Sequence, residues 1–220
     1  MKKKTMITVL GLIVGLHCLF AQTSKGTFSA GVSTTFEPFN QYIYPAGGFS
    51  FGSVQDKSDD PDFEDEKSKF RTVNVKPRFG YFVANRLAMG LDLQALQTWQ
   101  RQGDFTITTN TLMFGPFLRY YIPANKVLLF LETSGRAGQF TLKAENPNFE
   151  DSESKQRSNL MQWSTAAGAS FPLSNRFTFD VQTGYDFLRS QSQEDNPDNE
   201  RSIMRGMSLQ LGFTFFFPKA

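Results

Sequence analysis

Apolar and polar residues alternate along most of this chain, in segments of about ten residues. The pattern is clearest in Phe177–Phe187 and Met207–Phe217, where almost every odd-numbered residue is apolar and most even-numbered residues are polar or glycine. Successive side chains of a β-strand point to opposite faces, so this period predicts strands with one apolar and one polar face. No segment shows a convincing 3.6-residue apolar period over three helical turns. The alternation predicts eight strands, at Gly26–Phe36, Arg71–Val83, Leu87–Trp99, Leu112–Ile122, Val127–Ala137, Met161–Phe171, Phe177–Phe187 and Met207–Phe217.

The connections between these segments alternate in length. Three are short and contain an Asn, which tolerates the left-handed conformation of tight hairpin turns; they are Ala84–Arg86, Ala124–Lys126 and Ser174–Arg176. The other four are polar and mostly long, at Glu37–Ser68, Gln100–Asp104, Ala144–Ser158 and Ser190–Ser202. Short turns at one end and long loops at the other predict an all-β fold, an eight-stranded antiparallel up-and-down transmembrane β-barrel.

One further segment affects the strand count. Ala46–Gln55 also alternates, and counting it would give nine strands. Bacterial single-chain barrels have an even number of strands. We therefore expect strand one at Gly26–Phe36 and predict that Phe49–Gln55 is an extended part of the first loop.

Charged residues within the predicted strands lie on the polar parity. In a soluble barrel the apolar parity points inward, whereas in a membrane barrel it points outward and the lumen is polar. The polar parity carries four basic and four acidic residues, which are Lys76, Arg78, Arg119, Arg136, Asp92, Glu132, Asp180 and Asp186. This balance favours a lumen closed by a charge network, and a soluble exported β-protein is the alternative. Aromatic residues assigned to the apolar parity predict girdles at the membrane interfaces; they are Tyr81, Trp99, Tyr121, Trp163, Phe177 and Tyr185.

The first 21 residues have the layout of a secretory signal peptide. Lys2–Lys4 precede the apolar run Met6–Phe20, and Ala21 is a small residue at the expected cleavage point. We expect residues 1–21 to be removed and residues 22–220 to form the barrel domain. Cleavage would remove the only His and the only Cys of the chain and leave 20 Lys and Arg against 21 Asp and Glu. So small a charge does not favour a nucleic-acid partner.

Three stretches resemble the small outer-membrane β-barrel domain family of OmpA/OmpX type: Lys25–Phe28 (KGTF), Gly80–Leu91 (GYFVANRLAMGL) and Gly115–Tyr121 (GPFLRYY). The resemblance covers essentially the whole mature chain. It implies an eight-stranded barrel, with no particular function because members of the family serve many roles. It also implies an aromatic assembly signal near the C-terminus, which Phe213, Phe215 and Phe217 fit, and biogenesis through the barrel assembly machinery.

The residue types of the mature chain argue against catalysis. A serine nucleophile needs a base such as His, and no His remains after cleavage. We therefore expect no enzymatic activity and no cofactor. The motifs Asp60–Asp65 (DPDFED) and Asn146–Asp151 (NPNFED) nearly match, and Asn196–Asp198 is a fainter copy. Carboxylates suit Ca²⁺ or Mg²⁺, but no Asp-x-Asp-x-Asp-Gly frame is present, so we predict solvated acidic loops and no metal site.

Basic residues gather where the strands meet the long loops. Arg pairs well with phosphate, so these residues are candidates for contacts with lipopolysaccharide phosphates, although interfacial snorkelling would also explain them. They are Lys69, Arg71, Arg101, Arg157, Arg189, Arg201 and Arg205.

We therefore predict a monomeric, non-enzymatic integral protein of the cell outer membrane, with outer-membrane lipid and lipopolysaccharide as its surroundings. Its lumen is closed and salt-bridged, and its role is structural or surface-interacting, through long external loops. The alternative is a narrow pore for ions or small solutes. Eight strands enclose an interior that side chains can just fill, which argues against a wide pore.

Overall fold

A computed structural model describes residues 22–36, 49–55, 67–103, 105–145, 154–193 and 201–218. The expected signal peptide, the acidic motifs at 60–65, 146–151 and 196–198, and most of the long loops lie outside these residues. Within the described part of the chain, no helix is both long and apolar enough to cross a membrane.

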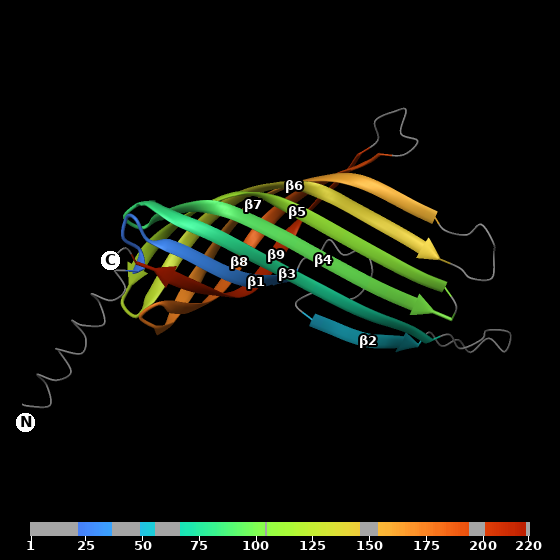
Figure 1. The fold of residues 1–220 in the computed structure, drawn as a ribbon, viewed down its shortest axis with the longest axis horizontal. Helices are drawn as coiled ribbons and strands as arrows, with labels where there is room; N and C mark the ends of the chain where they lie inside the picture. Colours follow the sequence, from blue (N-terminus) through green and yellow to red (C-terminus); the bar gives the residue numbers. More distant parts are fainter. Residues whose placement is uncertain are drawn as a thin grey trace, which may run out of the picture.

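Nine strands form one antiparallel sheet (Figure 1). They are β1 (Phe28–Phe36), β2 (Phe49–Gln55), β3 (Lys67–Ala84), β4 (Leu87–Gln102), β5 (Phe105–Ala124), β6 (Val127–Glu145), β7 (Ser154–Ser174), β8 (Phe177–Ser192) and β9 (Arg201–Phe217). Consecutive strands from β3 to β9 are hydrogen-bonded neighbours, and β1 pairs with both β9 and β3. These pairings close a ring of eight strands, β1 and β3–β9. The predicted eight-stranded, up-and-down antiparallel barrel is confirmed.

The ninth strand, β2, does not enter this ring of eight. It pairs with Lys67–Val73 of β3, on the loop side of the segment Lys76–Tyr81 that pairs with β1. The prediction that Phe49–Gln55 is not one of the eight ring strands is confirmed, but the segment is a strand paired with β3 and not an unpaired part of the first loop. The physical reason is that β3 is 18 residues long and β1 only 9, so the backbone groups at the loop end of β3 need another partner.

The three short connections are two-residue turns at Asn85–Arg86, Asn125–Lys126 and Asn175–Arg176. Asn125 takes a positive φ of 53°, as expected for Asn. In the first turn it is Arg86, at φ 69°, that adopts this conformation. Asn85 instead accepts a hydrogen bond from the backbone N–H of Lys25, at 2.9 Å.

The strands continue further toward the long loops than the alternation predicts. The predicted segment Leu112–Ile122 is part of a 20-residue strand, and the predicted loop Gln100–Asp104 is reduced to the two residues between β4 and β5. The added part of β5, Phe105–Thr111, reads FTITTNT. Thr lies on both of its faces, and its two apolar residues, Phe105 and Ile107, have the inward parity of Thr111. The outward apolar pattern of Leu112–Ile122 therefore ends here, although the backbone pairing continues.

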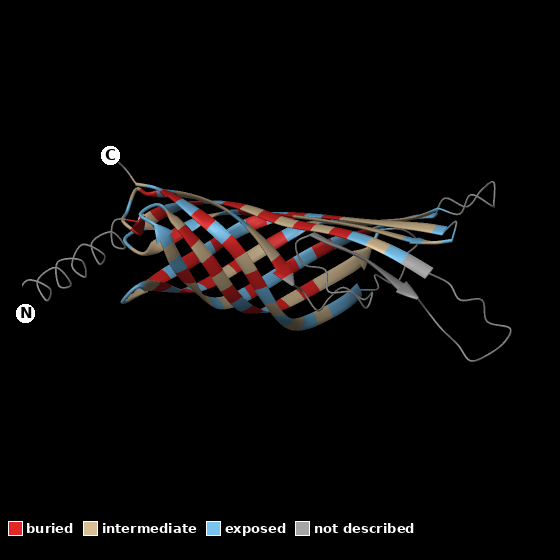
Figure 2. Ribbon diagram, turned by 90° about the horizontal axis from the view of Figure 1, so that it is seen from below, coloured by how far each residue is buried: buried red, intermediate tan, exposed pale blue. Residues whose placement is uncertain are grey.

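Burial alternates along each strand and separates the two faces of the wall (Figure 2). On β5 the inward residues from Thr111 to Tyr121 are buried and the outward residues from Leu112 to Ile122 are exposed. The same division places Phe82, Ala88, Leu128 and Phe216 inside the ring. The outer wall is thus apolar and the interior mainly polar, as the parity predicts.

Close strand contact at Gly115 generates a test of this wall. A Cβ on Gly115 would lie 1.9 Å from the carbonyl oxygen of Gly135 on β6, whereas a Cβ on Gly135 would meet only the Trp163 ring, at 3.5 Å. Gly115→Ala should therefore lower the free energy of unfolding by about 1–3 kcal/mol, the usual cost of overpacking. Gly135→Ala, the matched control, should change it by less than about 0.5 kcal/mol. Urea unfolding of both variants in lipid vesicles gives the comparison, and equal stabilities would contradict this strand packing.

Candidate functional site

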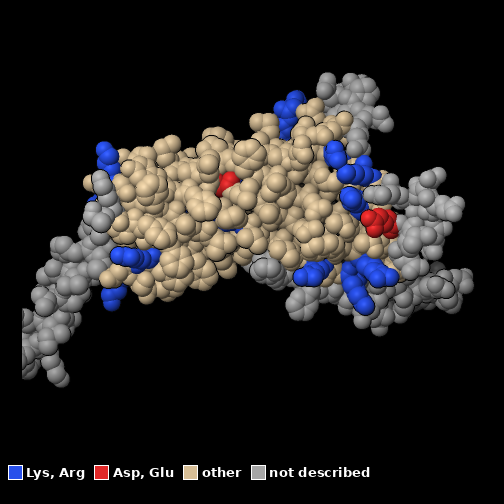
Figure 3. All heavy atoms as spheres, in the orientation of Figure 1, with Lys and Arg blue, Asp and Glu red and all other residues tan. Residues whose placement is uncertain are grey.

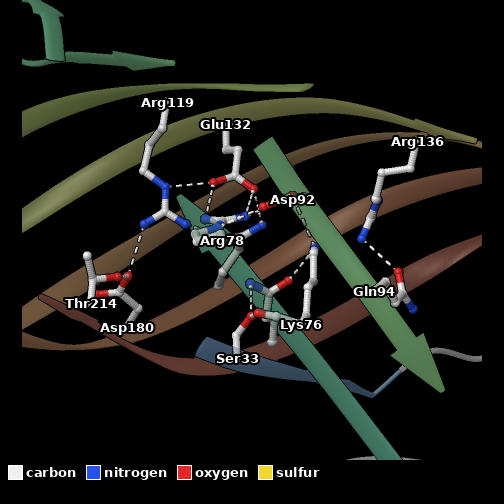
Figure 4. A network of polar contacts seen from close by, with 12 residues as sticks. Ser33, Lys76, Arg78, Asp92, Gln94, Arg119, Glu132, Arg136, Asp180 and Thr214 are labelled. Carbon is white, nitrogen blue, oxygen red and sulfur yellow. Dashed lines mark hydrogen bonds and ion pairs between the residues drawn. The ribbon is translucent and has the colours of Figure 1, made fainter. Parts of the chain in front are cut away.

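The interior of the barrel holds the eight charges that the sequence singles out, each 7 % exposed or less. Six of them form a continuous ladder of alternating sign, in the order Lys76, Asp92, Arg78, Glu132, Arg119 and Asp180 (Figure 4). The ladder crosses the interior from β3 and β4, through β5 and β6, to β8. Three positive charges meet three negative charges, so it is neutral as a unit.

The centre of the ladder is Glu132, which two arginines hold. Arg78 donates to both carboxylate oxygens of Glu132, at 2.7 and 3.0 Å, and Arg119 Nε donates to Oε2 at 2.6 Å. Arg78 also donates to both oxygens of Asp92, at 2.9 and 3.1 Å. Two-pronged contacts of this kind fix the guanidinium plane as well as its position. Lys76 Nζ stands further from Asp92, at 3.7 Å.

Uncharged side chains complete the coordination of the ladder. Gln210 accepts from Lys76 Nζ at 2.9 Å, and Gln182 accepts from Arg119 Nη2 at 3.2 Å. The hydroxyls of Thr178 and Thr214 each donate to Asp180, at 2.9 Å. Buried charges are stable only when their remaining donors and acceptors are also satisfied. These four residues, none of which the sequence analysis assigned to the site, supply that satisfaction.

The remaining two charges, Arg136 and Asp186, are joined indirectly. Arg136 donates to Gln94 Oε1 at 2.7 Å and to Ser164 Oγ at 3.1 Å, and Ser164 Oγ donates in turn to Asp186. Gln162 also donates to Asp186, at 3.2 Å. Among the described residues, no cation lies within ion-pair distance of Asp186. Arg136 therefore belongs to a layer with Asp186 rather than with Glu132, its neighbour on β6.

Two buried phenylalanines lie against the arginines of the ladder. The guanidinium carbon of Arg78 is 4.5 Å from the centre of the Phe117 ring, and that of Arg119 is 3.9 Å from the Phe130 ring. Phe130 fits only because Gly168 has no side chain, since a Cβ there would come within 2.4 Å of the ring. Cation–π contact strengthens when water is excluded. The parity analysis did not identify either ring, because it assigned the interior to polar residues.

Apolar side chains also fill the interior at the turn end. Phe82, Ala88, Tyr121, Leu128, Phe130 and Phe216 form one buried cluster. The prediction that Tyr121 lies in an outer girdle is wrong. Tyr121 has the parity of Arg119, is 3 % exposed, and accepts a hydrogen bond from Arg119 Nη1 at 3.3 Å. By contrast Tyr81, Trp163 and Tyr185 are exposed on the outer wall.

A second apolar cluster lies on the loop side of the Arg136 layer. It comprises Met113, Leu160 and Leu188, with Phe140 and Met204 packed against it. A cavity of about 10 Å³ lies beside the ladder, lined on its polar side by Arg78, Arg119, Asp180, Gln182, Gln210 and Thr214. That volume suits about one water molecule. Within the described residues, no group of three His, Cys, Asp or Glu side chains could hold a metal ion.

The seven predicted basic residues lie on strand segments toward the loop end, on the outward parity; six are exposed and Arg189 is half-buried. Lys69 stands directly opposite Arg101, and the guanidinium of Arg71 lies 5.5 Å from the ring of its cross-strand partner Trp99. The structure adds a second like-charged pair that the sequence analysis did not include, Lys143 opposite Lys155. We name these nine residues the basic belt.

Further basic residues lie at the turn end: Lys25, Arg86, Lys126 and Arg176. On the face shown in Figure 3, Lys and Arg gather at the two ends and the wall between them is nearly free of charge. Of the five acidic side chains that the structure describes, only Glu145 lies at the loop end of the wall, and the other four are inside.

No protein-family model matches the sequence, and no curated protein matches it. Among solved structures, the chain is similar to the outer membrane protein OprG from Pseudomonas aeruginosa, with 14 % identity over 90 % of this chain and 99 % of that one, at a TM-score of 0.46. It is also similar to Ail, the attachment invasion locus protein of Yersinia pestis, with 12 % identity over 88 % of this chain and 99 % of that one, at a TM-score of 0.44. Neisserial surface protein A is similar with 12 % identity over 87 % of this chain and 96 % of that one, at a TM-score of 0.43. The architecture of this chain is established by its own strand pairing.

The two kinds of interior carboxylate generate a stability prediction. Glu132→Gln would leave Arg78 and Arg119 facing a neutral amide, and breaking a buried ion pair costs about 3–5 kcal/mol. Asp186→Asn keeps an acceptor for Ser164 and Gln162, so it should cost only about 1–2 kcal/mol. Urea unfolding of both variants in vesicles, followed by tryptophan fluorescence, measures the difference. A cost for Asp186→Asn as large as that for Glu132→Gln would show that the ladder is not the main source of interior stability.

Proposed function

We propose that this chain is a non-enzymatic, monomeric integral protein of the outer membrane with a closed interior, and that it acts as a structural or surface-interacting element. The observation that carries the proposal is the apolar band on the outer wall. On β5 the outward residues from Leu112 to Ile122 are apolar or aromatic, with Leu112 and Phe114 55 % and 64 % exposed. Such a surface on a water-soluble protein would be a strong aggregation hazard.

The height of this band fits a bilayer. A membrane-spanning β-strand needs about 9–11 residues at a tilt of about 45°, and Leu112–Ile122 meets that length. Basic residues border the band at both ends, where lipid phosphates lie, and Tyr81, Trp163 and Tyr185 are exposed between them. Aromatic side chains of this kind favour the membrane interface.

The filled interior supports a structural rather than a conducting role. The ion ladder spans the ring, and apolar clusters lie on its turn side and its loop side. Passage of a solute would require charges to separate in a narrow space. Export through a cleaved signal peptide at residues 1–21, and insertion by the barrel assembly machinery, form part of the same proposal.

The outward face of β5 provides the test of membrane placement. Leu118→Arg puts a charge near the middle of the band and should cost about 2–4 kcal/mol of stability in a bilayer. Thr108→Arg lies ten residues toward the loops on the same face of the same strand, and should cost about 0–1 kcal/mol. Both are compared by urea unfolding in phospholipid vesicles. Equal costs, or recovery of the wild-type protein in the soluble periplasm, would contradict the proposed placement.

Electrical recording tests the closed interior. The wild-type protein should give no stepwise conductance in a planar bilayer. Arg119→Ala combined with Arg136→Ala leaves Lys76 and Arg78 against four carboxylates and should open a leak that prefers cations. The matched control Arg101→Ala with Arg157→Ala removes the same charge from the outer wall and should remain silent. Stepwise conductance in the wild-type protein would favour the narrow pore instead.

A further inference from the structure

The strongest unexplained feature outside the interior is the loop end of the β3–β4 hairpin. Lys69 and Arg101 are direct cross-strand partners with exposed side chains on the outer wall. Directly opposed like charges on neighbouring strands destabilise a sheet. Arg71 lies one outward position below Lys69 and adds a third positive charge. We call these three residues the cradle.

Two contacts orient the cradle for a ligand outside the wall. Arg71 lies over the ring of Trp99, which holds the flat guanidinium against the strand surface. Arg101 Nε donates to the carbonyl oxygen of Gly103 at 3.1 Å, and among the described residues its terminal nitrogens make no hydrogen bond. Neither contact neutralises a charge.

No acidic residue in the described part of the chain neutralises the cradle. Four of the five acidic side chains are in the interior. The fifth, Glu145, pairs with Thr106, and Thr106 pairs with Arg101. Glu145 is therefore two strands from Arg101, roughly 10 Å at the usual strand spacing. Among the described residues, Lys69, Arg71 and Arg101 form no ion pair.

We infer that the cradle binds one phosphate on the headgroup of the phosphate-bearing glycolipid of the outer leaflet. This inference rests on the proposed membrane placement. Directly opposed side chains start about 4.5–5.5 Å apart, so one phosphate can bridge Lys69 and Arg101 while a further oxygen meets Arg71. Guanidinium groups match phosphate geometry through paired N–H donors.

The wall below the cradle favours a lipid phosphate over a free ion. Outward positions toward the turn end on the same two strands are Val73, Val75, Ala95 and Leu93, with Gln97 the one polar residue among them. An acyl chain attached to the bound headgroup would lie along this mainly apolar surface. A free phosphate ion would gain nothing from it. Lys143 and Lys155, the other directly opposed like-charged pair, provide the comparison pair for the test.

The test uses the folded full-length mature protein in a neutral detergent, with bis-phosphorylated lipid A as the probe. Native mass spectrometry counts bound lipid on the wild type and on the variant Lys69→Gln/Arg71→Gln/Arg101→Gln. The wild type should retain one lipid A, and the variant should bind at least about ten-fold more weakly, since each lost contact is a charge-assisted hydrogen bond. Trp99→Leu keeps all three charges and should weaken binding about two- to five-fold by releasing Arg71.

Two further arms separate the sources of phosphate. Dephosphorylated lipid A should bind the wild type as weakly as lipid A binds the cradle variant. Inorganic phosphate alone, measured by calorimetry, should show no saturable binding at concentrations where lipid A is bound. Tight binding of inorganic phosphate would overturn the inference that the ligand is a lipid.

Two control variants remove three and two positive charges elsewhere on the outer surface. Lys25→Gln/Lys126→Gln/Arg176→Gln, at the turn end, should leave the binding of lipid A within about two-fold of the wild type. If Lys143→Gln/Lys155→Gln lowers binding as much as the cradle variant, the belt attracts lipid diffusely and the cradle is not a site. Insertion of each variant into vesicles is scored in parallel. A protein that inserts but retains no lipid A contradicts the cradle alone, whereas one that fails to insert contradicts the proposed function as well.

Discussion

The ion ladder centred on Glu132 is the interaction on which the rest of this barrel depends. Eight strands leave an interior just wide enough for side chains, so charges placed there cannot keep their full hydration. Glu132 escapes this cost because Arg78 and Arg119 both donate to it, at 2.6–3.0 Å. Each arginine then reaches a second carboxylate, Asp92 or Asp180. Neighbouring strands of the ring are joined by backbone hydrogen bonds. The ion pairs of the ladder also link strands that are not neighbours, such as β3 with β6 and β5 with β8.

The ladder also explains why aromatic rings and glycines occur in an interior that the parity analysis treats as polar. A guanidinium has two flat faces that make no hydrogen bonds, and Phe117 and Phe130 cover such faces of Arg78 and Arg119. A ring needs more room than the narrow interior offers beside an ordinary residue. Gly168 supplies that room opposite Phe130. Charge, ring and glycine thus form one packing unit, in which the glycine is needed for the absence of a side chain.

Much of the fold could be predicted from the sequence because the two faces of each strand meet different surroundings. The alternation of apolar and polar residues predicts the eight ring strands, the Asn-containing turns between them, and the inward direction of all eight charged side chains. The contrast fails at the loop ends of the strands, such as Phe105–Thr111, where Thr lies on both faces and the apolar Phe105 and Ile107 have the inward parity. The strand lengths and the pair Lys143–Lys155 therefore do not follow from it. Tyr121 was misassigned because residue type was given more weight than its parity, which matches that of Arg119. Partners across the ring, such as Arg119 with Asp180 directly and Arg136 with Asp186 through Ser164, depend on the stagger between strands, which alternation does not encode.

Strand length separates the part of the wall that a bilayer can cover from the part that it cannot. The longest strand, β7, has 21 residues, about 70 Å along its path and roughly 50 Å in height at the usual tilt. The apolar band of a membrane barrel is about 25 Å tall. On the proposed placement, close to half of β7 and a smaller share of the shorter strands would therefore stand clear of the hydrocarbon, on the side of the long loops. The cluster of Met113, Leu160 and Leu188 inside this half gives it a core of its own. On that placement, a packed extension of this kind would form a rigid base above the lipid surface, which fits the proposed surface-interacting role better than the narrow pore.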